Sequence, residues 1–237
     1  MAVVIPAGGA GVRMGGPRKQ FRLLGGLPVL VHALRACAGA AAVGWRVVAV
    51  PEDGVASAED LLGRHGLADV RVVAGGPTRQ ASVARALAAV PGEAAFVLVH
   101  DAVRPFLSPD VLARVLAAVR EVGAAAPAVP VADTLRSLGR DRRLGATHDR
   151  DALVAMQTPQ GARADWLRDA YARAERSGLG GTDDVALLQA AGYPVAAVEG
   201  DARLFKLTRP EDFALAEALL PVWGAALARS KQPGAGV

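Results

Sequence analysis

The chain has 237 residues, of which 52% are hydrophobic, and 27 basic side chains stand against 23 acidic ones, for a net charge of +4. This length suits one large α/β domain, and the apolar content excludes disorder for most of the chain. The basic residues are dispersed and aromatic residues are few, which argues against a nucleic-acid partner and favours small anions as ligands.

No apolar run reaches the roughly 18 residues that a membrane helix needs. The single cysteine, Cys37, excludes a disulfide framework and a cysteine metal cluster. We therefore expect a soluble cytoplasmic protein with no membrane partner.

Short β-rich runs alternate along the chain with segments of helix length. This alternation is typical of βα units around a mainly parallel sheet, with helices on both of its faces. The runs predict strands near residues 2–5, 45–50, 70–73, 95–99 and 124–129. The fold class is therefore α/β.

Two helix starts carry their own signals. Ser108 before Pro109 is typical of an N-cap followed by a first helical position. Thr208 and Glu211, three residues apart, match a capping box, which would place Lys206 at the end of a preceding strand.

The alternation breaks between Asp133 and about Met156, where the chain becomes rich in Arg and Asp. A loop of this length inside a compact domain is usually functional or has structure of its own. We predict a projecting β-arm over residues 134–156 that contacts another subunit, and composition leaves a mobile surface loop open as the alternative. Residues 1–228 are predicted to form one domain, and residues 229–237 a disordered tail.

A glycine-rich loop, PAGGAGVRMGGPRKQ at positions 6–20, follows the first strand. Glycines let backbone N–H groups approach a phosphate closely, and Arg13, Arg18 and Lys19 add positive charge. The dinucleotide fingerprint fails because Met14 stands where its third glycine belongs, and the P-loop pattern fails because Gln20 follows Lys19. We predict a phosphate-binding loop of another kind, in preference to a flexible turn with solvated cations.

Two later segments also follow strands. Residues 75–83, GGPTRQASV, open a helix whose free N–H groups suit a nucleotide base or ribose, although Gly-Gly-Pro is also an ordinary strand-to-helix turn. Asp101 follows the strand at 95–99, and open parallel sheets bind ligands at the carboxyl ends of their strands. The plainer alternative is that Asp101 pairs with Arg104 to hold a turn.

Metal and nucleophile patterns are weak. The four histidines have no zinc-ligand spacing, so a metal is expected to be Mg²⁺, held largely by substrate phosphates. Asp183 and Asp184 after Thr182 suit either an acid/base pair or, as we favour, carboxylates that stabilise a helix N-terminus. Only three basic residues are lysines, at positions 19, 206 and 231, and a lysine in an arginine-dominated chain points to a need for a compact ammonium group.

These segments, in this order, resemble the 2-C-methyl-D-erythritol 4-phosphate cytidylyltransferase family over nearly the whole chain. The residues that carry the resemblance are the loop at 6–20, Gly75, Gly76, Arg79, Ser82, Val83, His100, Asp101, Ala102, Arg104, Pro105, Asp133, Thr134, Arg150, Thr158, Pro159, Gln160, Thr182, Asp183, Lys206, Thr208, Pro210, Glu211 and Asp212.

The resemblance implies a Rossmann-like nucleotidyltransferase (GT-A-like) fold with a mixed, mostly parallel twisted sheet. It also implies transfer of CMP from CTP to 2-C-methyl-D-erythritol 4-phosphate, with pyrophosphate released, Mg²⁺ as cofactor and a homodimer built by the arm. A ribitol-5-phosphate cytidylyltransferase is the nearest alternative, and a non-catalytic nucleotide-binding module is a more distant one.

The resemblance further implies roles for individual residues. Arg13, Lys19, Lys206 and Arg150 would be catalytic. Nucleotide contacts would come from Ala7, Gly8, Gly9, Gly76, Ser82 and Asp101, of which Asp101 is also a possible metal ligand. Acceptor contacts would come from Arg104, Arg150, Thr158, Thr182 and Lys206, with Arg150 reaching the site from a neighbouring subunit.

Overall fold

A computed structural model describes residues 1–8, 18–38 and 43–230 and places an eight-stranded sheet at the centre of this part of the chain. The strand order is β10-β7-β11-β6-β1-β4-β5, and β12 also pairs with β7. The strands are β1 (Ala2–Pro6), β4 (Trp45–Val50), β5 (Arg71–Ala74), β6 (Phe96–Val99), β7 (Ala124–Pro130), β10 (Val154–Met156), β11 (Gln160–Arg163) and β12 (Ala196–Glu199).

The sheet is mixed, as predicted. Strand β1 runs parallel to β4 and β6, β4 to β5, and β7 to β12, whereas β10 and β11 pair antiparallel with their neighbours. All five predicted strands are confirmed, with ends shifted by no more than one residue. The prediction omitted β10, β11 and β12, which are three or four residues long.

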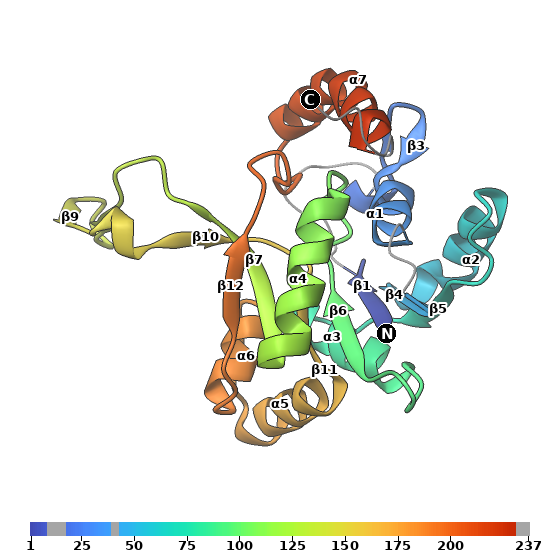
Figure 1. The fold of residues 1–237 in the computed structure, drawn as a ribbon, viewed down its shortest axis with the longest axis horizontal. Helices are drawn as coiled ribbons and strands as arrows, with labels where there is room; N and C mark the ends of the chain where they lie inside the picture. The colour runs from blue at the N-terminus through green and yellow to red at the C-terminus, as the bar shows by residue number, and fades with distance from the viewer. Residues whose placement is uncertain (9–17, 39–42, 231–237) are drawn as a thin grey trace, which may run out of the picture.

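Helices cover both faces of the sheet (Figure 1). They are α1 (Val29–Ala38), α2 (Val55–Arg64), α3 (Arg79–Ala88), α4 (Pro109–Val122), α5 (Ala164–Ser177), α6 (Asp184–Ala190) and α7 (Pro210–Ser230), with 3-10 turns η1 (Lys19–Phe21), η2 (Glu52–Gly54) and η3 (Arg150–Ala152). Within the described ranges, no helix combines the length and apolarity needed to cross a membrane.

Alternate residues of the central strand β1 pack on opposite faces of the sheet, because successive side chains of a strand point to opposite sides. Val3 and Ile5 belong to one buried cluster, which includes residues of α1 and α4. Ala2 and Val4 belong to another, which includes residues of α3 and α5. Burial on both faces explains why β1 reads as a continuous apolar run.

The two predicted helix starts have different outcomes. Ser108 caps α4 as predicted, since its Oγ accepts a hydrogen bond of 3.3 Å from Val111 N. The capping box at α7 is wrong, because Asp212 takes the place of Glu211. Asp212 Oδ2 accepts hydrogen bonds from Thr208 N at 2.5 Å, Thr208 Oγ at 2.7 Å and Arg209 N at 2.7 Å.

The segment before α7 also differs from its prediction. Lys206 lies in an irregular stretch beyond the end of β12 at Glu199, and not at a strand end. Helix α7 continues through Arg229 and Ser230, where a tail was predicted. The rest of that tail, residues 231–237, lies outside the described residues.

The predicted arm is a projecting β-structure. Strands β8 (Arg136–Leu138) and β9 (Leu144–Thr147) pair antiparallel, and η3 leads back from them into β10. Residues 132–155 are all exposed, and the arm stands away from the body of the molecule (Figure 1). A second short hairpin, β2 (Leu23–Leu24) with β3 (Leu27–Pro28), lies against α7.

Candidate active site

The candidate site lies at one edge of the sheet, where three strands end. Ala7 and Gly8 follow β1, Gly75 and Gly76 follow β5, and Asp101 lies two residues beyond β6. Because β1, β4, β5 and β6 are parallel, their carboxyl ends meet at this edge. The sequence placed these segments after strands, and the structure brings them together.

Backbone segments from β1 and β5 approach each other closely where α3 begins. We call the residues at this point, Gly8, Gly75, Gly76 and Ser82, the glycine corner. Gly76 N donates to Ser82 Oγ at 3.1 Å, and Ser82 Oγ donates to Thr78 O at 2.9 Å. A Cβ on Gly8 would lie 2.9 Å from Ser82 Oγ, and a Cβ on Gly76 would lie 2.4 Å from the Ala81 Cβ. Side chains would therefore displace this backbone.

The predicted nucleotide residues Gly8, Gly76 and Ser82 thus lie together. Ala7 is buried beside them and donates its N–H to Ala49 O at 2.7 Å. Two other predicted residues, Gly9 and Arg13, lie outside the described residues.

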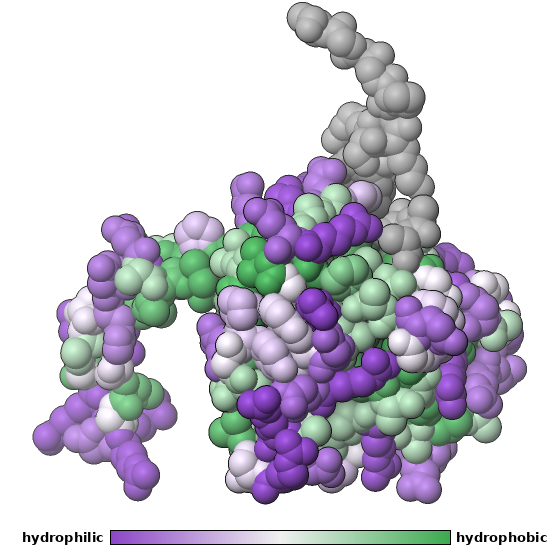
Figure 2. Space-filling view, turned by 60° about the horizontal axis from the view of Figure 1, so that its bottom comes forward, coloured by the Kyte–Doolittle hydropathy of each residue, from purple (hydrophilic) through white to green (hydrophobic). Residues whose placement is uncertain are grey.

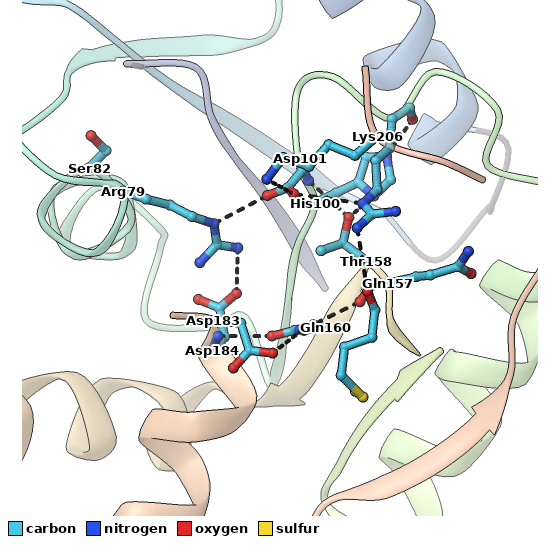
Figure 3. A network of polar contacts seen from close by, with 12 residues as sticks. Arg79, Ser82, His100, Asp101, Gln157, Thr158, Gln160, Asp183, Asp184 and Lys206 are labelled. Carbon is cyan, nitrogen blue, oxygen red and sulfur yellow. Dashed lines mark hydrogen bonds and ion pairs between the residues drawn. The ribbon is translucent and has the colours of Figure 1, made fainter. Parts of the chain in front are cut away.

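Asp101 is the centre of a charged cluster (Figure 3). Its Oδ2 lies 2.9 Å from Lys206 Nζ and 3.7 Å from Arg104 Nε, and its Oδ1 lies 3.2 Å from Arg79 Nε. Burial alone would raise the pKa of Asp101, but the charges of Lys206, Arg79 and Arg104 hold it well below its usual range. The carboxylate is therefore ionised and its two oxygens are assigned to different cations.

His100 supports this cluster from beneath. Burial lowers the pKa of His100 to about 4, so the ring is neutral near pH 7. Nε2 lies 3.0 Å from Arg104 O and donates to it, which leaves Nδ1 to accept from Thr158 Oγ at 3.0 Å. Thr158 Oγ in turn accepts from Asp101 N at 3.1 Å. The buried hydroxyl of Thr158, a predicted acceptor contact, thus fixes the backbone of Asp101.

The two predicted lysines come from distant parts of the sequence and meet near the same edge. Lys19 Nζ donates to Thr208 O at 3.0 Å, although the two residues are 189 positions apart in the sequence. Thr208 lies two residues after Lys206. Lys206 is partly exposed, with 42% of its side chain accessible while its Nζ contacts Asp101.

Arg104 is predicted to bind the acceptor, but its guanidinium contacts mostly backbone carbonyl oxygens of the chain itself. Nη1 donates to Leu204 O at 2.7 Å, and Nη2 lies 3.4 Å from Met156 O. Together with the bond from Leu207 N to Val103 O at 2.9 Å, this contact fixes the segment that carries Lys206.

The two remaining predicted acceptor residues, Thr182 and Arg150, come from other segments of the chain. Thr182 is exposed in the loop before α6. Arg150 lies in η3 of the arm, where it contacts Ala132 O at 2.9 Å and the Asp151 carboxylate at 3.9 Å. A single copy of the chain therefore does not gather every predicted residue at one point.

Sequence reasoning gave Arg79 no individual role, and it placed Asp183 and Asp184 together at a helix N-terminus without predicting the pair between Arg79 and Asp184. Asp183 caps α6, accepting from Ala186 N at 2.9 Å, which confirms the helix-terminus interpretation. Asp184 instead is wholly buried and lies 2.7 Å from Arg79 Nη2. A signal existed, because Leu187 and Leu188 follow Asp184 by three and four residues, so the carboxylate shares the apolar face of its helix.

The surroundings of Asp101 do not suit a metal ligand. Three cationic side chains already face its carboxylate and would repel a divalent ion. Within the part of the chain that the structure describes, no group of three or more His, Cys, Asp or Glu side chains is arranged to hold a metal ion.

Phosphorylated ligands suit this edge best, because a glycine corner admits a ligand to the backbone and ammonium groups neutralise phosphate charge. On a mixed sheet that opens at its carboxyl edge, this chemistry is that of the α/β nucleotidyltransferases.

The chain belongs to the 2-C-methyl-D-erythritol 4-phosphate cytidylyltransferase family, whose model matches residues 1–221. The relative from Salinibacter ruber is 52% identical over 224 residues, covering 94% of both chains, and that from Thermus thermophilus is 45% identical over 225 residues, covering 95% of this chain and 99% of the relative. Both are named as cytidylyltransferases of this type.

Solved structures agree with the fold. The crystal structure of the Thermus thermophilus enzyme superposes with a TM-score of 0.76 at 42% identity, covering 93% of this chain and 98% of that one. The synthase from Anaerococcus prevotii gives a TM-score of 0.82 at 27% identity, covering 93% and 95%. The predicted resemblance and the nucleotidyltransferase class are confirmed.

Proposed function

We propose that this chain transfers CMP from CTP to 2-C-methyl-D-erythritol 4-phosphate and releases pyrophosphate. Membership of the family supports the reaction. One observation of the site supports the assignment of the reaction to particular residues of this chain. Lys19 and Lys206, the two lysines that the structure describes, come together at the carboxyl edge of the sheet, where Lys19 binds Thr208 O and Lys206 binds Asp101.

In the proposed reaction, a phosphate oxygen of the acceptor attacks the α-phosphorus of CTP. A new P–O bond forms as the bond from the α-phosphorus to the bridging oxygen breaks, and pyrophosphate leaves with that bond's electron pair. Both reactants are anions, so catalysis rests on holding them in line and on neutralising charge that develops at the α-phosphate. No covalent intermediate on the protein is needed.

We assign the cations to this task. Lys206, partly exposed and held by Asp101, would neutralise the reacting phosphates. Lys19 and Arg13 would contact the triphosphate. The glycine corner with Ala7 and Gly9 would hold cytidine through backbone groups, and Asp101 would accept a hydrogen bond from a sugar or acceptor hydroxyl. Thr182 would contact the acceptor, and Arg104 and Thr158, which were predicted to do the same, would support the acceptor side by holding the Lys206 segment and the Asp101 backbone.

We propose that Mg²⁺ arrives on the phosphates of CTP and supplies further positive charge there. The three cations facing Asp101 argue against that carboxylate as its ligand. Mg²⁺ commonly keeps waters and takes substrate phosphates as ligands, which fits a site whose described residues form no carboxylate cage.

We propose that the arm builds a homodimer. It exposes large apolar side chains at Leu138 (63% exposed), Leu144 (72%) and Val154 (53%), which the described residues of one copy leave largely uncovered. Figure 2 shows green apolar residues among purple polar ones along the arm, which stands apart from the body. Such exposure on a projecting segment is typical of a protein interface. Arg150 of one subunit would then reach the acceptor phosphate in the other.

The test is pyrophosphate release by the purified protein with CTP and Mg²⁺, with 2-C-methyl-D-erythritol 4-phosphate and ribitol 5-phosphate compared side by side. We expect release with the first. Release only with ribitol 5-phosphate would show that the acceptor is ribitol 5-phosphate and that the acceptor pocket is assigned wrongly. Binding of CTP without release from either acceptor would support a non-catalytic module.

A further inference from the structure

Arg79 bridges two buried carboxylates from different parts of the fold (Figure 3). Its Nε lies 3.2 Å from Asp101 Oδ1, and its Nη2 lies 2.7 Å from Asp184 Oδ2. Burial alone would lower the pKa of Arg79, but the charges of Asp184 and Asp101 raise it above its ordinary value. The guanidinium is therefore a permanent cation held from two sides.

The Asp184 end of this bridge is anchored in the core. The carboxylate is fully buried, and its other oxygen, Oδ1, accepts a 2.5 Å hydrogen bond from the Tyr171 hydroxyl. Burial and the neighbouring Asp184 charge raise the pKa of Tyr171, so its phenol remains a donor. The backbone N–H of Asp184 donates to Gln160 Oε1 at 2.8 Å. Both ends of the residue are thus fixed by α5 and β11.

The contacts form one continuous chain from the core to the site. Tyr171 on α5 binds Asp184 on α6, and Asp184 pairs with Arg79 on α3. Arg79 pairs in turn with Asp101 after β6, and Asp101 pairs with Lys206. Of the two oxygens of Asp101, Oδ1 is turned to Arg79 and Oδ2 to Lys206. The orientation of the Asp101 carboxylate, and with it the place of the Lys206 ammonium, depends on the contact with Arg79.

Arginine has a specific advantage in this position. Its planar fork presents several N–H donors in fixed directions, whereas the single ammonium of lysine is a point charge on a flexible stem. Here two different nitrogens, Nε and Nη2, serve two different carboxylates at once. A lysine would supply the charge without the double contact.

We propose that Arg79, anchored by Asp184, is a positioning residue that sets the place of Lys206 through Asp101. The inference rests on the proposed cytidylyl transfer. Without Arg79 the carboxylate of Asp101 is free to turn and to take the Lys206 ammonium away from the reacting phosphates. The loss falls on the chemical step, because preorganised charge acts mainly in the transition state.

The experiment compares Arg79→Gln, Arg79→Lys, Asp184→Asn and the double variant Arg79→Gln/Asp184→Asn with the unaltered protein. Pyrophosphate release gives kcat and KM for both substrates, and calorimetry gives the Kd of CTP alone. Arg46→Gln is the matched control, since Arg46 pairs with Asp69 at the amino end of β4, away from the site.

We expect Arg79→Gln to lower kcat at least tenfold, with the Kd of CTP changed less than threefold. Arg79→Lys should recover less than half of the lost activity, and Arg46→Gln should keep kcat within twofold. In the Arg79→Gln background, Asp184→Asn should change kcat less than twofold, because its effect passes through Arg79.

Three results would overturn the proposal. One is a kcat within twofold of the unaltered protein for Arg79→Gln. A second is full recovery by Arg79→Lys, which would mean that charge alone matters. The third is a double variant whose losses multiply, which would mean that Asp184 acts only on the fold. If Arg79→Gln does not fold, Asp184→Asn in the Arg79→Lys background decides by the same criterion. Failure of the proposed function looks different, since the unaltered protein would then release no pyrophosphate.

Discussion

Replacing His100 with Gln should remove a defined part of the pH dependence of stability. The ring is wholly buried, and burial lowers its pKa from the ordinary 6.5 to about 4. A group whose folded pKa is depressed in this way binds a proton more readily in the unfolded chain. Stability is therefore complete above about pH 6.5 and falls as the pH drops toward 4.

The size of the effect follows from the two values. Lowering a histidine pKa from 6.5 to about 4 corresponds to about 3 kcal/mol of unfolding free energy at 25 °C, lost progressively over that interval. Gln keeps one N–H donor for Arg104 O and one oxygen acceptor for the Thr158 hydroxyl, but it does not titrate. The free energy of unfolding of the variant should therefore decline less steeply than that of the unaltered protein between pH 6.5 and 4.

Urea unfolding at half-unit steps from pH 7.5 to 4 measures this decline. The exposed arm histidine offers a control, and His148→Gln should keep the steep slope of the unaltered protein. Asp101, whose pKa is lowered, contributes stability that is lost only as the pH falls below about 4, outside the interval. Parallel curves for His100→Gln and the unaltered protein would refute the reasoning.

Three further outcomes are expected. Lys206→Ala and Arg13→Ala should each lose at least about 10²-fold in kcat, the scale for one preorganised electrostatic contact, and near-normal turnover in both would contradict the assigned roles. Mixing inactive Arg150→Ala with inactive Lys206→Ala should restore pyrophosphate release if each site draws Arg150 from the other subunit, and no recovery in a mixture shown to exchange subunits would contradict a shared site. Gly76→Ala should weaken CTP binding at least about tenfold by calorimetry, because the new Cβ would lie 2.4 Å from the Ala81 Cβ, and an unchanged Kd would contradict the close approach.

The sequence predicted those features that residue patterns decide locally. Valine-rich runs such as Val47 to Val50 identify buried strands by themselves, and the capping preferences of Ser108 identify a helix start. Strand β11, with the sequence QGAR, has little strand preference of its own and exists because β6 and β7 flank it. Its place could not be predicted without the fold.

The same distinction holds in the site. Glycines and Asp101 after predicted strands marked the carboxyl edge, because the topology of a parallel sheet brings such positions together. Partners at long range were invisible, as with Arg79 and Asp184, which are 105 residues apart. The cap of α7 shows the limit at short range, since Glu211 matched the capping pattern and Asp212, one residue later, makes the bonds.

The hydrogen bond between Lys19 and Thr208 forms only late during synthesis of the chain on the ribosome. The two partners are made 189 residues apart, which at about 5–20 residues per second corresponds to roughly 10–40 s of synthesis. Throughout that time the nascent chain carries its glycine-rich loop without the second lysine. With Lys206 in its proposed role, a nascent chain cannot transfer a nucleotide until the segment beyond β12 has been translated.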